Sequence, residues 1–124
     1  MPLLAAAGCG GGDDGNGDLA NGKVFDPTAV KSCLRNQGFR IEPRETDIGI
    51  DFTVRWRSGL NNADVAAERD PGAAESREQE WKKLADEAGI DNIDNYYFRY
   101  GNFLLGYEKV PNKADRARIE RCLA

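Results

Sequence analysis

Hydrophobic and polar residues alternate without a break along the stretch from Thr46 to Trp56. The apolar positions of this stretch are Ile48, Ile50, Phe52, Val54 and Trp56. A period of two residues is typical of a strand with one buried and one solvated face, so the pattern predicts a long strand. A shorter alternation at Phe39 and Ile41 predicts a partner strand just before it.

A second pair of strands is predicted between residues 95 and 110, with a turn at Gly101-Asn102. A two-residue turn at this point would place opposite each other Tyr100 and Phe103, Phe98 and Leu105, and Tyr96 and Tyr107. All six residues are aromatic or apolar and would lie on one face, so the register and the hydrophobic pattern agree. Tyr97 and Arg99 would lie on the opposite face.

Start and stop signals predict three helices. Two of them begin with an aspartate N-cap followed by a proline, which suits the first helical position. The third follows a proline and has an asparagine cap. The predicted helices run from Asp26-Pro27 to Gly38, from Asp70-Pro71 to Gly89, and onward from Pro111-Asn112.

The predicted order is helix, strand pair, helix, strand pair, helix. This order favours an α+β fold in which helices pack on one face of a four-stranded, mainly antiparallel sheet. Residues 57–72 leave two interpretations open. Gly59 and two asparagines indicate a loop, whereas Ala63 to Arg69 would suit a short helix.

The beginning of the chain bears on where the protein works. Small residues precede a cysteine in Ala6-Ala7-Gly8-Cys9, and this motif resembles the lipobox of bacterial lipoproteins. The resemblance implies that residues 1–8 are the remnant of a signal peptide and that Cys9 carries lipid. Such a protein would be extracytoplasmic and anchored to the cell membrane by that lipid. The apolar run is short and no Lys or Arg precedes it, so a chance run of small residues is the alternative interpretation.

Two boundaries follow from this interpretation. Residues 9–23 hold Cys9 and a run rich in glycine and aspartate. Such a run cannot bury enough apolar surface to fold, so it predicts a flexible tether. Residues 24–124 then form one α+β domain.

Two cysteines remain once Cys9 is assigned to lipid. Cys33 and Cys122 occupy similar positions in amphipathic helical segments near the two ends of the domain. We expect them to form a disulfide, because exported proteins mature in an oxidising compartment. Two reduced, buried thiols are the alternative.

The chain resembles small uncharacterised exported proteins of high-GC Gram-positive bacteria in two stretches. One runs from Cys33-Leu34 through Gly38-Phe39, and the other from Arg99-Tyr100-Gly101-Asn102 to Arg121-Cys122-Leu123. The resemblance spans about half of the domain and implies no known activity.

The composition excludes several kinds of chemistry. The chain has no histidine, which removes Ser-His-Asp and Cys-His catalysis and the commonest metal ligand. It has no glycine-rich phosphate-binding motif. A net charge of −4 argues against a nucleic-acid-binding groove. We therefore expect no catalytic residue, no metal, no cofactor and no nucleic acid partner.

Four residues form the candidate binding face on the polar side of the predicted sheet. They are Arg55, Arg57, Tyr97 and Arg99. Arginine and tyrosine are the side chains that favour protein interfaces and planar anionic ligands. A solvated sheet face with ion pairs between strands is the alternative.

The leading hypothesis is a membrane-tethered, extracytoplasmic binding or protein-interaction module without catalysis, whose partner is an unidentified envelope protein. A second hypothesis is a carrier for a small anionic or aromatic molecule on the sheet face. It requires a deep pocket lined by Arg55, Tyr97 and Arg99. A third hypothesis is a histidine-free enzyme, which requires two buried carboxylates that face each other.

Overall fold

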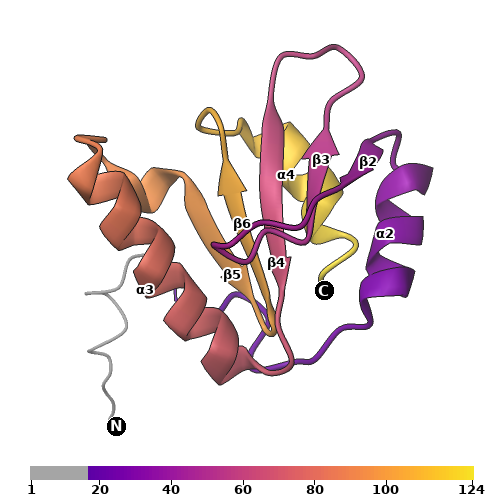
Figure 1. The fold of residues 1–124 in the computed structure, drawn as a ribbon. Coiled ribbons are helices and arrows are strands. Elements are labelled where there is room, and N and C mark those ends of the chain that lie inside the picture. Colours follow the sequence, from indigo (N-terminus) through magenta and orange to yellow (C-terminus); the bar gives the residue numbers. More distant parts are fainter. Residues whose placement is uncertain (1–16) are drawn as a thin grey trace, which may run out of the picture.

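A sheet of five antiparallel strands forms the centre of the fold (Figure 1). The structure is a computed structural model that describes residues 17–124. The strands are β2 (Arg40–Pro43), β3 (Phe52–Arg55), β4 (Asn62–Ala67), β5 (Tyr97–Tyr100) and β6 (Phe103–Tyr107). Their spatial order is β2-β3-β4-β6-β5. Cys9, the predicted signal peptide remnant and residues 10–16 of the predicted tether lie outside the described residues.

The α+β class is confirmed, but the prediction of four strands is wrong because the ambiguous stretch contains β4. This strand lies between β3 and β6 and completes the sheet. Its members Ala63, Val65 and Ala66 are almost fully buried, two on one face and one on the other. Alanine favours helices in isolation, but burial between two neighbouring strands overrides that preference.

The long strand predicted from Thr46 to Trp56 is also shorter than expected. Only Phe52–Arg55 forms β3, and residues 46–50 form a turn. The backbone N–H of Gly49 donates to the carbonyl of Thr46, and the N–H of Ile50 donates to its hydroxyl. Gly49 has a φ of +86°, which ends the strand geometry. Ile50 consequently packs on the opposite face of the sheet from Phe52.

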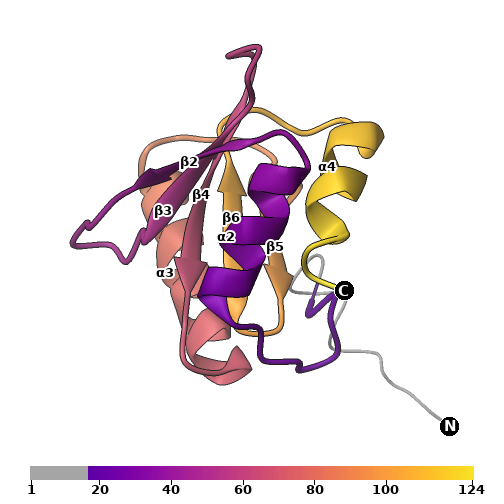
Figure 2. The ribbon, with the colours of Figure 1, turned by 90° about the vertical axis from the view of Figure 1, so that its right-hand side faces the viewer.

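Helices cover both faces of the sheet, which corrects the prediction that they share one face (Figures 1 and 2). One face packs against α2 (Pro27–Asn36) and α4 (Lys113–Glu120), and the other packs against α3 (Pro71–Glu87). A short 3-10 turn, η1 (Ile93–Asn95), follows α3. The physical reason is a second apolar cluster, which includes Ile50, Ala66, Trp81 and Leu104 and excludes water only when α3 lies on it.

Local signals in the sequence are confirmed where they concern helix ends and the hairpin. The side chains of Asp26, Asp70 and Asn112 each accept a hydrogen bond from a backbone N–H in the first turn of their helix. In the hairpin, Tyr100 lies opposite Phe103 and Phe98 opposite Leu105, as the two-residue turn predicts.

The first described residues, which belong to the predicted tether, pack against this hairpin. The N–H of Leu19 donates to the carbonyl of Arg99, and Ala20 is buried in the main core. The Asp18 carboxylate accepts from the backbone N–H groups of Ala20, Gly22 and Gly101. Burial opposes ionisation of Asp18, but these hydrogen bonds outweigh it and lower the pKa of the carboxyl.

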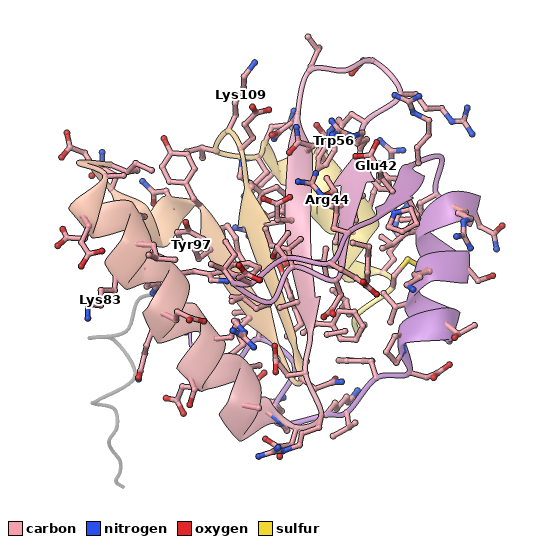
Figure 3. The ribbon with its side chains drawn as sticks, in the orientation of Figure 1. Glu42, Arg44, Trp56, Lys83, Tyr97 and Lys109 are labelled. Atoms are coloured by element: carbon pink, nitrogen blue, oxygen red, sulfur yellow. A yellow bond between two sulfur atoms is a disulfide. The ribbon has the colours of Figure 1, made fainter. Side chains whose placement is uncertain are left out.

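The predicted disulfide between Cys33 and Cys122 is present (Figure 3). It joins α2 to the segment after α4, and the two Cα atoms are 5.6 Å apart. The bond closes a chain segment with a sequence separation of 89 residues. In the chain-entropy account a loop of this length stabilises the folded state by about 4–5 kcal/mol.

Loss of this bond should therefore lower the melting temperature by roughly 15–40 °C, since 1 kcal/mol shifts the midpoint of a domain of this size by about 4–8 °C. The measurement compares the oxidised protein, the reduced protein and a Cys33→Ala/Cys122→Ala variant by circular dichroism. The variant is its own control, because reductant should leave its melting curve unchanged. Identical curves for oxidised and reduced wild-type protein would contradict the prediction.

Candidate functional site

The structure divides the four residues of the candidate binding face among separate environments. Arg99 is buried beneath α3, and Tyr97 is half-buried beside Trp81. Arg55 lies on the uncovered half of the sheet, where its guanidinium forms an ion pair of 3.0 Å with Glu42. Arg57 lies beyond the end of β3 and is exposed. The expected open face is therefore limited to the half of the sheet that α3 leaves uncovered.

Arg99 belongs to a buried ion-pair network between β5 and α3. Its Nη1 lies 2.5 Å from Oε1 of Glu78, and these two residues are 8% and 2% exposed. Lys82 lies 3.4 Å from the other Glu78 oxygen and 2.8 Å from Asp94. Burial raises the pKa of Glu78, although Lys82 and Arg99 act against this shift.

This network does not have the composition of a two-carboxylate catalytic site. Among residues 17–124, Glu78 is the only buried acidic residue, and the groups that face it are the cations Arg99 and Lys82. A glycosidase-type pair requires a second carboxyl group across a cleft. The arrangement instead fixes α3 on the sheet through paired, desolvated charges.

A groove lies between the C-terminal half of α3 and the sheet, and we call it the α3 groove. Its volume is about 370 Å³. Three of its apolar side chains remain substantially exposed: Ile48 by 37%, Leu84 by 42% and Ile90 by 44%. Trp81 and Tyr97 also line it, with ring centroids 6.2 Å apart. The α3 groove is therefore a concave surface with unusually accessible apolar walls.

Gly106 in β6 has no side chain, so the rings of Tyr97 and Trp81 can pack against its backbone. A Cβ atom at Gly106 would lie 2.8 Å from Cε1 of Tyr97 and 3.4 Å from Cε3 of Trp81. Tyr97 is the cross-strand partner of Gly106, so its ring covers the glycine backbone. Burial, followed by the charge of nearby Asp64, raises the pKa of Tyr97, so its phenol stays neutral.

The loop before β3 closes one side of the α3 groove. The indole N–H of Trp81 donates to the carbonyl of Ile48 at 2.7 Å, and the guanidinium of Arg77 donates to the same oxygen. Arg77 packs directly over Gly49, where any side chain would meet its guanidinium. These contacts hold the Ile48 side chain at the edge of the groove.

The charged side chains of the α3 groove are both carboxylates, those of Asp64 and Glu108. The hydroxyl of Thr53 donates to Asp64 at 2.9 Å, and the amide of Asn62 donates to Glu108 at 2.8 Å. Each carboxylate is thus oriented by one neutral donor. The chemical preference of the groove is for apolar groups next to a cation.

Of the residues that line the α3 groove, only Tyr97 is a candidate functional residue from the sequence. The alternation from Thr46 to Trp56 predicts Ile48 on the buried face of a strand. The isolated apolar residue Ile90 directly after the helix-ending Gly89 was the available signal for an exposed apolar position.

In the part of the chain that the structure describes, no group of three or more Cys, Asp and Glu side chains is arranged to hold a metal ion. None of the helices in residues 17–124 combines the length and apolar character needed to cross a membrane.

Arg99→Met should lower the free energy of unfolding by about 3–5 kcal/mol, because it leaves the Glu78 carboxylate buried without its main partner. Arg55→Met is the matched control, since it removes an exposed ion pair worth about 0–1 kcal/mol. A Glu78→Gln/Arg99→Met double variant should recover much of the loss. Urea unfolding measures the stability of all three variants. Equal losses of unfolding free energy for Arg99→Met and Arg55→Met would show that the buried ion pair does not stabilise the fold more than an exposed one.

The comparisons with known proteins give no relative for this chain: no family model, no curated protein and no solved structure matches it.

Proposed function

We propose that this protein is a membrane-tethered, extracytoplasmic binding module without catalysis, which takes a short segment of another envelope protein into the α3 groove. The observation that carries this proposal is the accessibility of Ile48, Leu84 and Ile90 around one concave surface. Exposed apolar residues scattered singly are ordinary, but a group of them in a groove is typical of an interaction site.

The charges of the α3 groove favour a partner segment that combines apolar side chains with Lys or Arg. Asp64 and Glu108 are the charged residues that line it, and no cationic side chain does. A volume of about 370 Å³ is at the low end of the range for small-molecule sites. It suits a few side chains of a peptide better than a large cofactor.

The lipobox-like motif and the glycine-rich run supply the tether in this proposal. Lipid on Cys9 would hold the domain at the membrane surface, and the run after it would give the domain reach. The absence of histidine and the cationic surroundings of Glu78 support binding without catalysis.

The small-molecule alternative on the sheet face has less support. It requires one pocket that includes Arg55, Tyr97 and Arg99. The α3 groove contains Tyr97 but neither arginine, and Arg99 is engaged with Glu78.

Labelling with a palmitate analogue in cells tests the anchor. The native gene product should incorporate the label, and a Cys9→Ala variant should not, because no other residue resembles a lipidation site. The amount of each protein is compared by immunoblot as the control. Equal labelling of both proteins, or no labelling of either at equal abundance, would contradict the anchor while leaving the groove proposal standing.

Peptide display on the purified full chain tests the groove. Selected peptides should carry apolar residues next to Lys or Arg, and Leu84→Lys should abolish their binding by charge repulsion and loss of apolar contact. Val24→Lys is the matched control, because Val24 is 64% exposed and lies outside the α3 groove. Glu108→Gln keeps the hydrogen bond from Asn62, so it should weaken basic peptides by at most about fivefold.

Both lysine substitutions replace exposed side chains and should leave unfolding within about 0.5 kcal/mol of wild type. If the selected peptides bind Leu84→Lys and Val24→Lys equally well, the α3 groove is not the recognition site.

A further inference from the structure

A second cavity lies at the end of the sheet, between the β3–β4 turn and the loop from β6 to α4, and we call it the end cavity. Figure 3 shows Trp56 and Lys109, which line it, at the same end of the sheet. Its volume is about 580 Å³, within the range of small-molecule sites. No residue of the end cavity lines the α3 groove, so the two sites are separate.

Positive charge gathers in the end cavity although the protein as a whole carries a net charge of −4. Arg57, Lys109 and Arg118 line it, and Asp115 is the only acidic side chain among the lining residues. The three cations come from separate parts of the chain: the segment after β3, the segment after β6, and α4. The fold therefore brings together charges that the sequence keeps apart.

Hydrogen bonds to the backbone orient two of these cations. Nε of Arg57 donates to the carbonyl of Gly38 at 2.9 Å, and Nη2 of Arg118 donates to the carbonyl of Gln37. An arginine side chain has five N–H donors, so the bond to Gly38 leaves Arg57 with donors for an anion. Planar, oriented guanidinium groups of this kind favour a carboxylate or another oxyanion.

A buried amide fixes the position of Lys109. Nδ2 of Asn61 donates to the carbonyl of Lys109, and Oδ1 of Asn61 accepts from the N–H of Lys109. Asn61 is 8% exposed and belongs to the β3–β4 turn, so its side chain joins the two walls of the end cavity. The lysine is thereby presented from a rigid backbone.

The remaining walls are aromatic and aliphatic. Phe39 and Trp56 lie in contact, with ring centroids 4.9 Å apart, and Leu60 and Val110 are 69% and 54% exposed. The indole N–H of Trp56 is buried and has no hydrogen-bond acceptor.

We infer that the end cavity binds a small organic anion, a carboxylate on an aromatic or similarly sized apolar body. The carboxylate would lie between Arg57 and Lys109, and the apolar body would lie against Trp56, Leu60 and Val110. Apolar walls alone would admit a neutral molecule and cations alone would admit inorganic phosphate. The combination selects a ligand that has both parts.

Nuclear magnetic resonance of the two tryptophan indole N–H groups tests this site on the full chain. Trp81→Phe assigns the signals, because Trp56 and Trp81 are the only tryptophans. The probe is 2-naphthoate, which should shift the Trp56 signal in a saturable way. The same ring with the opposite charge, 2-naphthylmethylammonium, should not, and inorganic phosphate at equal concentration should give a clearly smaller shift.

Substitutions then locate the anion. Arg57→Gln/Lys109→Gln should weaken naphthoate binding by at least tenfold, and Arg57→Lys, which keeps the charge but loses the planar guanidinium, should weaken it less than the double variant does. Lys83→Gln is the matched control, since Lys83 is an exposed cation on α3 (Figure 3). Amide spectra of each variant establish that it is folded. If the double variant is unfolded, comparison of Arg57→Lys with the wild-type protein still tests the site.

Several outcomes would overturn the assignment. A shift of the Trp81 signal instead of the Trp56 signal would place the probe in the α3 groove. If phosphate shifts the Trp56 signal as much as naphthoate does, the site does not require an apolar body. If the naphthyl cation does so, the site does not require a negative charge. The result is independent of the peptide selection, which concerns residues of the α3 groove only.

Discussion

The packing of α3 against the second face of the sheet decides which residues of this protein can reach a partner. Trp81 packs with Leu104 and Ala66, and the buried ion pair between Glu78 and Arg99 joins α3 to β5 at the same interface. Because α3 packs mainly on β5 and β6 and less on β4, it covers only part of this face of the sheet. The α3 groove lies along the edge of α3, where the helix no longer covers the sheet.

Much of the fold could be predicted because its local signals are strong. Asp26-Pro27, Asp70-Pro71 and Asn112 begin helices through side-chain caps that involve only neighbouring residues. The turn at Gly101-Asn102 fixes the hairpin register in the same local way. The strand β4 was missed because its short side chains become strand residues only through pairing with β3 and β6, which are contacts that local patterns do not contain.

The candidate binding face was harder to predict, since alternation distinguishes two faces of a strand but does not say what covers each. The alternation predicts Arg99 on the polar face of its strand, yet its charge is matched by Glu78, which lies 21 positions earlier on α3. Tyr97 reaches the α3 groove only because Gly106 has no side chain. Both outcomes depend on pairs of residues that meet through the tertiary fold.

The geometry also relates the proposed tether to the proposed sites. The described chain enters the domain at Asp18, which is bound to Gly101 in the β5–β6 turn. The α3 groove reaches Glu108, and the end cavity includes Lys109, so both lie toward the other end of β6. Five residues of strand separate these ends by about 17 Å. With Cys9 lipidated as proposed, the tether would join the domain at the end of the sheet opposite both sites.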